Sequence, residues 1–144
     1  MSGSDNDCIF CQIVAGEIPS HTVYEDDQVF AFLDANPLAP GHTLVIPRDH
    51  HERLNDLSDD TAEALYAAVH DLVPAAEAAV DAPASNVGFN NGEESGQEVP
   101  HVHGHVVPRF ADDGGGSIHA VGGSAPDLDD AELADIADDI AAQH

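Results

Sequence analysis

The chain has 144 residues, of which 28 are Asp or Glu and 3 are Lys or Arg, so its formal net charge at pH 7 is -25. Binding to a nucleic-acid backbone or to an anionic membrane needs clustered Lys and Arg, and this composition argues against both partners. Apolar residues still make up 42% of the chain, which predicts an acidic but folded protein.

The acidity has two interpretations. Self-repulsion at this charge is large in dilute buffer, and it falls as salt shortens the screening length to about 3 Å at 1 M. The near-absence of lysine, with many Asp and small Ala residues, is similar to proteins of salt-in halophilic microbes, so we expect a halophilic source. The alternative is an acidic interaction surface in an ordinary cytoplasm.

The sequence also indicates a compartment. No apolar stretch approaches the roughly 20 residues that cross a bilayer, and residues 1–7 lack a basic region followed by an apolar one. Two cysteines are too few for a disulfide framework and suit a reducing environment. We therefore expect a cytoplasmic protein, folded as one domain because no internal repeat is visible.

The pattern of apolar residues predicts an α+β fold. Three short runs before the middle of the chain predict strands: residues 23–25, 29–33 and 43–47. Ser58 or Asp59 caps a long helix, which we expect Pro74 to kink or divide. Residues 87–90 and a histidine-rich segment then add two strands, which completes a mainly antiparallel sheet of five strands.

The composition changes after Phe110. Residues 111–117 are rich in Asp and Gly and predict a flexible loop. A last helix is expected from Asp127 or Asp129 to about Ala141, with three apolar residues on one face: Leu133, Ile136 and Ile140.

The most informative segment runs from Gln97 to Pro108 and carries histidines at two-residue spacing in a Val-rich run. In a β-strand, successive side chains alternate faces, so His101, His103 and His105 would share one face, about 6.5–7 Å apart. Such a row can bind a metal, relay protons or supply a nucleophile flanked by hydrogen-bond donors. The plainer alternative is a half-polar strand or an adventitious metal-binding tract.

This row resembles the signature His-φ-His-φ-His-φ-φ, with φ apolar, of the histidine-triad (HIT) family of nucleotidyl hydrolases and transferases. Gly104 departs from one φ, but it would face away from the histidines and affect packing behind the strand. Further segments resemble the family in the same order, over roughly residues 8–110: residues 8–11, 16–19, 31–34, 40–47 and 90–92.

The resemblance, closest to the prokaryotic Hint-like branch, implies a HIT-like fold that dimerises. Residues 1–110 would form the catalytic domain. Residues 111–144 would add an acidic Gly-rich loop and a C-terminal helix to the same domain, in a region that varies within the family.

The resemblance also implies the chemistry. His103 would attack the α-phosphate of a nucleotide and become transiently nucleotidylated, His105 would bond the phosphoryl group or the leaving atom, and His101 would complete the catalytic triad. A neutral imidazole is nucleophilic, and a pKa near 6.5 leaves a substantial neutral fraction at pH 7. The acidic field should raise the histidine pKa values and neighbouring imidazoles should lower them, so the net sign stays open.

For the nucleoside, the resemblance implies that Phe10 and Phe32 line the pocket and that Asp34 accepts hydrogen bonds from the ribose hydroxyls. Two plainer roles compete with this interpretation. Phenylalanines are common core residues, and an Asp just after an apolar strand is commonly a turn residue.

For the phosphate, the resemblance implies that Asn90 and Gln97 hold the phosphate-binding loop or contact the ribose-phosphate. Backbone amides around Gln97 and Glu98 would cradle the non-bridging oxygens. Related enzymes often carry Ser where Glu98 stands, so only the main-chain contribution would survive at that position.

Cys8 and Cys11 form a Cys-x-x-Cys motif, a spacing that serves zinc, redox chemistry and iron–sulfur clusters alike. Zinc-containing members of the resembled superfamily complete a tetrahedral site with a histidine after the Val-Ile-Pro strand and with the first triad histidine. Here these would be His50 and His101, although His51 leaves the register ambiguous. The implied Zn²⁺ would be structural.

The implied function is hydrolysis of the bond between a nucleoside monophosphate and its leaving group. Adenosine phosphoramidates and diadenosine polyphosphates are both candidate substrates. Two other classes stay open: a nucleotide-binding or scaffolding protein of the same fold, and a small zinc protein whose histidines are all structural.

Overall fold

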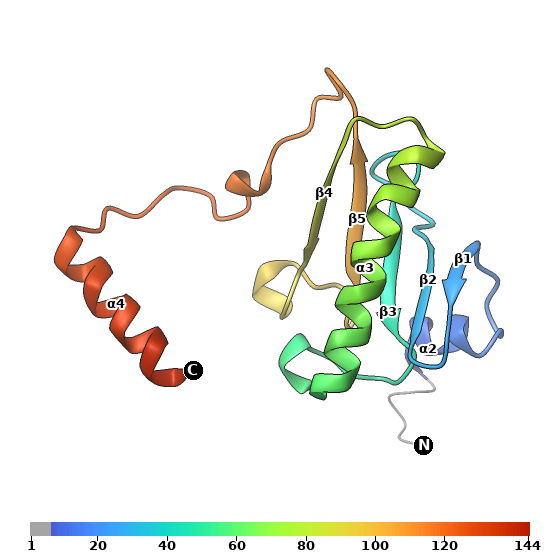
Figure 1. Cartoon of the computed structure of the whole chain (residues 1–144), viewed down its shortest axis with the longest axis horizontal. Coiled ribbons are helices and arrows are strands. Elements are labelled where there is room, and N and C mark those ends of the chain that lie inside the picture. Colours follow the sequence, from blue (N-terminus) through green and yellow to red (C-terminus); the bar gives the residue numbers. More distant parts are fainter. Residues whose placement is uncertain (1–6) are drawn as a thin grey trace.

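The computed structural model describes residues 7–144, so the expectation about a targeting segment in residues 1–6 lies outside it. One sheet forms in the order β1-β2-β3-β5-β4, and each neighbouring pair is antiparallel (Figure 1). This confirms the predicted α+β fold. The strands are β1 (Thr22–Glu25), β2 (Val29–Leu33), β3 (Thr43–Pro47), β4 (Ala84–Phe89) and β5 (Gly104–Arg109).

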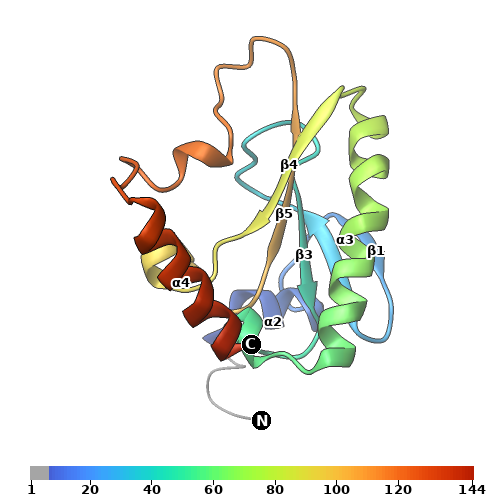
Figure 2. The same cartoon turned by 60° about the vertical axis from the view of Figure 1, so that its left-hand side comes forward.

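The two faces of the sheet are covered by different helices (Figures 1 and 2). The long helix α3 (Asp59–Ala79) packs on one face, and the short helix α2 (Ile9–Val14) lies on the other. Val29 and Ala31 belong to the core under α3, whereas Phe30 and Phe32 belong to the core under α2. Strand β2 is therefore buried on both faces, which explains its continuous apolar run.

Helix α3 begins as predicted but is not divided. The Ser58 hydroxyl accepts the Thr61 N–H at 3.2 Å and caps the first turn. The helix continues through Pro74, so the predicted division is wrong. Val73 and Ala76, on either side of the proline, both pack against the core, and this packing offsets the hydrogen bond that proline removes.

The histidine segment joins the sheet later than predicted. Strand β5 begins at Gly104, so the prediction that all three histidines lie on one strand is wrong. The His101 N–H turns back to the Val99 carbonyl, and the Val102 N–H donates to the His51 carbonyl, both at 2.8 Å. These bonds pair the start of the segment with loops instead of with β3.

Gly104 accommodates a neighbouring aromatic side chain. It lies opposite Phe89 in the β4–β5 pair, and a Cβ at position 104 would lie 2.7 Å from the Phe89 Cζ. Phe89 also packs against Tyr66 of α3, with ring centroids 5.5 Å apart. The missing side chain is therefore replaced by the Phe89 ring, in agreement with the expected packing role of Gly104.

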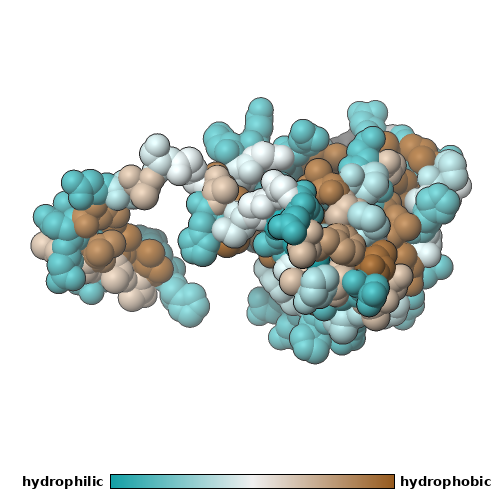
Figure 3. Space-filling model, turned by 90° about the horizontal axis from the view of Figure 1, so that it is seen from above, coloured by the Kyte–Doolittle hydropathy of each residue, from teal (hydrophilic) through white to brown (hydrophobic). Residues whose placement is uncertain are grey.

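Helix α4 (Asp130–Gln143), at the end of the C-terminal segment, stands apart from the sheet (Figures 1 and 2). Every residue from Ala111 to His144 is exposed. Helix α4 forms near its predicted position, and Asp129 and Glu132 make a capping box at its start. Its apolar residues Leu133 and Ile136 face solvent and contribute to the apolar patch on this helix (Figure 3).

No helix among residues 7–144 is long and apolar enough to cross a membrane. The division at residue 110 and the dimer both stay predictions.

Candidate active site

His103 is held with one ring nitrogen toward the main chain. Its Nδ1 lies 2.8 Å from the carbonyl oxygen of His101. A carbonyl oxygen only accepts hydrogen bonds, so Nδ1 carries the hydrogen and Nε2 keeps the lone pair. The Phe10 ring packs edge-on against the imidazole, with centroids 5.1 Å apart. The nitrogen of His103 that keeps a lone pair is therefore Nε2.

A chain of hydrogen bonds sets the opposite role for His105. The Leu38 N–H donates to His42 Nδ1 at 3.0 Å, so the hydrogen of a neutral His42 is on Nε2. That Nε2 lies 3.0 Å from His105 Nδ1, which must then accept, leaving the hydrogen of His105 on its own Nε2. His105 Nε2 is buried and finds no partner within residues 7–144. A phosphoryl oxygen would satisfy this donor.

The sequence reasoning missed His42. It lies 63 positions before His105, and no local spacing connects the two residues. The available signal was a histidine directly before the apolar strand β3, inside a segment that already resembled the family. The structure makes it a buried side chain, 2% exposed, with Asp34 3.7 Å from its Nε2.

Burial decides the sign of the histidine pKa shifts. Desolvation lowers the pKa of His101 and His105 to about 4, and it also lowers the pKa values of His42 and His103. Neighbouring imidazoles add to the lowering for His105, while the Asp34 carboxylate opposes it. The imidazoles are therefore mostly neutral at pH 7, as the hydrogen-bond chain from Leu38 through His42 to His105 requires.

A second cluster lies on the other side of His103. Cys8 Sγ is 3.3 Å from His101 Nδ1, and Cys11 Sγ is 3.4 Å from His50 Nδ1. The four ligand atoms all lie within 4.8 Å of one another. His51 is not a member, and its main-chain carbonyl instead accepts the Val102 N–H.

The cluster fits a tetrahedral metal. Bonds of about 2.3 Å to sulfur and 2.0–2.1 Å to nitrogen require ligand atoms about 3.3–3.8 Å apart, and Cys11 Sγ lies 3.4 and 3.6 Å from the two histidine nitrogens. His101 Nε2 donates to the Pro47 carbonyl at 2.8 Å, which leaves Nδ1 as the lone pair facing the thiols. This outer hydrogen bond is typical of a metal-bound histidine.

The three residues expected to contact the nucleoside are Phe10, Phe32 and Asp34, and each has a contact within the chain itself. Phe10 and Phe32 are buried in the core under α2, with ring centroids 5.5 Å apart. Asp34 Oδ1 accepts the Asn36 N–H at 2.9 Å, while its Oδ2 is the atom near His42. All three therefore have packing or turn roles in the chain itself, and Asp34 also lies beside His42.

Gln97 fixes a loop. Its Nε2 donates to the carbonyls of Glu52 and Val99 at 2.7 and 3.0 Å, and its Oε1 accepts the Gly92 N–H at 2.8 Å. Its own N–H donates to the Gly92 carbonyl. Gln97 therefore joins three chain segments, as the loop-holding alternative requires.

Asn90 and Glu98 lie in different places. Asn90 is exposed and lines a groove that also contains His105. Glu98 is exposed and lines a hollow beside Cys8 and His50. Its carboxylate slightly raises the pKa of His103 against the larger effect of burial. The two side chains line different hollows, and the expected phosphate contacts of Asn90 and of the backbone around Glu98 stay predictions.

The fold and the paired histidine clusters define a histidine-triad protein. A family model described as "HIT domain" matches residues 15–112. The chain is 46% identical over 107 residues to an uncharacterized HIT-like protein of Methanocaldococcus jannaschii, covering 74% of this chain and 82% of that one. The chain belongs to the HIT domain family.

Two further similarities extend this result. A crystal structure of a HIT-family protein from Bacillus subtilis superposes with a TM-score of 0.86 at 38% identity, covering 96% of this chain and 97% of that one. The adenylylsulfatase HINT3 of Arabidopsis thaliana is 38% identical over 104 residues, which are 72% of this chain and 53% of that protein.

Proposed function

We propose that the protein is a nucleotidyl hydrolase or transferase that attacks the α-phosphate of a nucleotide through His103. The observation that carries this proposal is the pair of opposite tautomers. His103 presents a lone pair at Nε2, and His105 presents a hydrogen at Nε2, with ring centroids 5.0 Å apart. A nucleophile beside a donor is what phosphoryl transfer needs. The relative named adenylylsulfatase supports the same reaction class.

The proposed reaction has two steps: transfer of the nucleotidyl group to His103, and hydrolysis of that intermediate. In the first, a bond forms between His103 Nε2 and phosphorus, the bond from phosphorus to the leaving group breaks, and the leaving group takes a proton from water. The imidazole ring becomes positive, and the His101 carbonyl stabilises that charge through the Nδ1 hydrogen. In the second, water attacks phosphorus, the Nε2–P bond breaks, and the nucleoside monophosphate leaves with a proton released to solvent.

His105 and His42 act in both steps. The Nε2 hydrogen of His105 bonds a phosphoryl oxygen on which charge develops, which stabilises the transition state. His42 is a positioning residue, because its hydrogen bond holds His105 in the tautomer that donates.

We also propose that Cys8, Cys11, His50 and His101 hold Zn²⁺. Bound zinc would tie the N-terminal helix to the histidine segment and keep both thiols deprotonated. This zinc site would lie next to His103, because the His101 side chain would be a zinc ligand while the His101 carbonyl accepts the hydrogen of His103 Nδ1.

The direct test follows adenosine 5′-phosphoramidate and diadenosine tetraphosphate by 31P NMR in molar KCl. We expect wild-type protein to release AMP from at least one substrate and His103→Ala to lose more than about 10³-fold in rate, because it removes the nucleophile. His70→Ala is the matched control, since the His70 side chain is exposed on α3. AMP binding without turnover of either substrate would instead favour the nucleotide-binding class.

We further propose that the charge of -25 is an adaptation to high salt. Repulsion among the carboxylates falls as salt screens them, so we expect the melting temperature to rise steadily between 0.1 and 2 M KCl. A melting temperature that does not increase over this range would contradict the proposal and favour an acidic interaction surface.

A further inference from the structure

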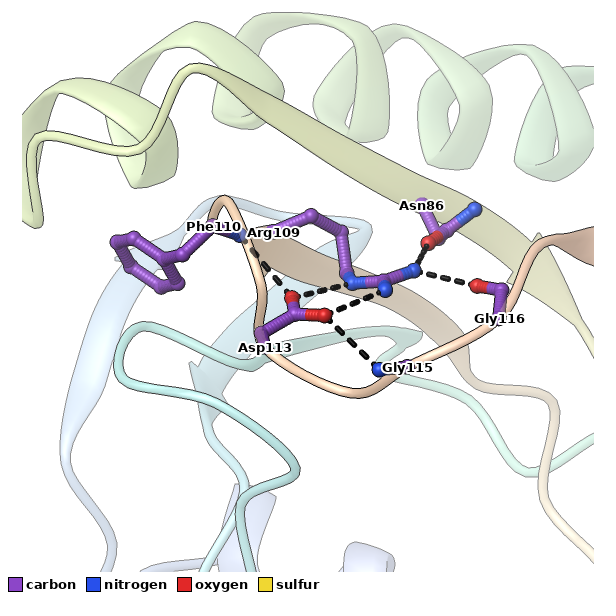
Figure 4. Close-up of polar contacts among 6 residues, drawn as sticks. All are labelled: Asn86, Arg109, Phe110, Asp113, Gly115 and Gly116. Atoms are coloured by element: carbon purple, nitrogen blue, oxygen red, sulfur yellow. Dashed lines mark hydrogen bonds and ion pairs between the residues drawn. The ribbon is translucent and has the colours of Figure 1, made fainter.

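One polar cluster outside the proposed reaction is a structural anchor (Figure 4). Arg109 of β5 forms a bidentate pair with Asp113 at 2.7 and 2.8 Å, and it also donates to the Asn86 side chain and to the Gly116 carbonyl. These bonds tie β4, β5 and the start of the C-terminal segment together. The guanidinium and the carboxylate neutralise each other, so this cluster explains how the chain leaves the sheet and points to no ligand.

The side chains of Cys8 and Cys11 differ from this anchor, because they can react with each other. The Cys8 carbonyl accepts the Gln12 N–H at 3.0 Å, and the Cys8 sulfur accepts the Cys11 N–H at 3.4 Å, so the two cysteines enclose the first turn of α2. Over one helical turn, Cα atoms three positions apart lie about 5 Å from each other, inside the range of about 4.4–6.8 Å that disulfides span. The two sulfur atoms already lie within 4.8 Å of each other. Rotation of the side chains, with little movement of the backbone, therefore brings the sulfur atoms to bonding distance.

The two thiols differ in exposure. Cys8 is 5% exposed and belongs to the core under α2, whereas Cys11 is half-buried. Redox-sensitive cysteine pairs combine an accessible thiol, which meets the oxidant, with a second thiol that resolves the product. Exposure therefore gives Cys11 the first role, and position gives Cys8 the second.

The surroundings of the pair favour a small oxidant without charge. A hollow of about 780 Å³ beside Cys8 is lined by four acidic residues of the described chain: Asp7, Glu52, Asp56 and Glu98. Their carboxylates repel anionic disulfides such as oxidised glutathione. Hydroperoxides are small and neutral, so this hollow admits them more readily.

We propose that Cys8 and Cys11 are a redox-sensitive modification site, which a hydroperoxide converts to an intrachain disulfide that lowers the rate of the proposed reaction. The disulfide rests on the positions of the two sulfur atoms. Two consequences of it rest on earlier proposals: the release of Zn²⁺ on the proposed zinc site, and the lower rate on the proposed function.

The oxidation has two balanced steps. First, the Cys11 thiolate attacks an oxygen of the hydroperoxide, an S–O bond forms, the O–O bond breaks, and the alkoxide or hydroxide that leaves takes a proton from solvent. Cys11 is then a sulfenic acid. Second, the Cys8 thiolate attacks the Cys11 sulfur, the S–S bond forms, the S–O bond breaks, and the hydroxide takes a proton to become water. The two sulfur atoms together lose two electrons, which reduce the peroxide bond.

Disulfide formation removes two of the four proposed zinc ligands. His50 and His101 remain, and two imidazoles alone do not complete the four-coordinate site that structural zinc takes. The His101 Nδ1 also loses the two thiol contacts that it makes at 3.3 and 3.6 Å. The ring is then held by its bond to the Pro47 carbonyl.

Phe10 connects the cysteines to the proposed nucleophile. It lies between Cys8 and Cys11 in the chain, and its ring packs edge-on against His103 with centroids 5.1 Å apart. The sulfur atoms must approach to about 2.05 Å, which shifts the turn that carries Phe10. Oxidation therefore disturbs a contact of His103 as well as the metal site.

The test treats zinc-loaded wild-type protein with hydrogen peroxide in molar KCl and follows free thiols, bound zinc and intact mass. We expect both thiols to be lost together, one Zn²⁺ to be released for each pair, and the mass of the chain to fall by about 2 Da, the two hydrogens that a disulfide lacks. Dithiothreitol and added Zn²⁺ should restore all three quantities. Oxidised glutathione at the same concentration should act about tenfold more slowly or less.

Two variants assign the roles of the cysteines. In Cys8→Ser the sulfenic acid of Cys11 has no resolving thiol, so we expect dimedone to trap it. In Cys11→Ser we expect dimedone to label the buried Cys8 at least about fivefold more slowly. The matched control is His51→Ala, which keeps both cysteines and all four proposed ligands and should respond to peroxide as wild-type protein does.

The effect on the rate is separated from the loss of zinc in His50→Ala, which lacks one proposed ligand and keeps both cysteines. We expect peroxide to lower its kcat/KM for adenosine 5′-phosphoramidate about threefold through the shift of Phe10, and dithiothreitol to restore it. In His50→Ala/Cys8→Ser, which cannot form the disulfide, no reversible fall should occur. An equal reversible fall in both variants would overturn the proposed effect of the disulfide on the rate.

The remaining outcomes separate the proposals. Reduced protein that never binds zinc would overturn the zinc site, while the paired loss of thiols and of about 2 Da would still support the disulfide. Thiols of zinc-loaded protein that survive peroxide, or that give sulfinic acid, an interchain disulfide or a glutathione adduct instead, would overturn this inference and leave the zinc site standing. The thiol and mass measurements need no turnover, so they decide the disulfide even where wild-type protein acts on neither substrate, the result that would overturn the proposed function.

Discussion

His101 and His103 lie two residues apart, yet their side chains belong to clusters of different chemistry. The ring of His101 faces two thiols and His50, whereas His103 faces His105, which a further imidazole holds in place. The main chain connects the clusters, since the His101 carbonyl accepts the hydrogen of His103 Nδ1. The difference teaches that neighbouring residues of one motif can face different surroundings, and the proposed functions would divide this motif between a metal site and the reaction.

The variant His42→Leu tests whether the His103–His105 cluster carries the reaction. After His103→Ala, this is the variant that we expect to lower kcat/KM the most. Without the donor from His42, the His105 ring can exchange tautomers, and we expect kcat/KM to fall about 10–100-fold, as for other residues that orient a functional imidazole. Zinc content and melting temperature should change little by comparison. His70→Leu is the exposed control.

The decisive measurement for His42→Leu is the 15N chemical shift of the His105 ring. At pH 7 the ring is neutral, because burial lowers its pKa to about 4, so the shifts report the tautomer directly. We expect the hydrogen on Nε2 in wild-type protein and a mixture in the variant. A variant with lower activity and an unchanged tautomer would contradict the positioning role.

For the proposed zinc site, the neighbouring residues His50 and His51 give a matched pair of variants. We expect both to affect activity less than His42→Leu does. His50→Ala removes one of the four proposed ligands, whereas His51→Ala leaves all four in place. We expect bound zinc to fall from about one per chain to near zero in His50→Ala only, with a melting temperature lower by about 5 °C or more.

Activity should survive better in His50→Ala than in His42→Leu. His101 keeps its hydrogen bond to the Pro47 carbonyl at 2.8 Å, so its own carbonyl stays near His103, and we expect kcat/KM to fall less than tenfold. Equal zinc in the two variants, measured on protein purified without nickel affinity, would refute the zinc proposal. A loss of activity larger than that of His42→Leu would contradict the separation of the clusters.

Much of the fold was predictable because local patterns determine it. The strands β2 and β3 are apolar runs of strand length, and Ser58 caps a helix whose apolar residues recur at helical spacing. Pro74 shows the limit of local reasoning, because packing on both sides of it keeps the helix continuous. Helix α4 shows another limit, since its apolar pattern was correct and yet its residues are exposed.

The sequence by itself determined which chemical groups are present and how they are spaced: the histidine row, the Cys-x-x-Cys motif and the acidic composition. The tertiary structure alone decided which nitrogen of each imidazole carries a hydrogen, because the partners are a carbonyl and a histidine supplied by the fold. It also decided that the histidine pKa values fall, because desolvation outweighs the nearby carboxylates. Residue types and spacings are local properties of a chain, whereas burial and hydrogen-bond partners exist only once distant segments have packed together.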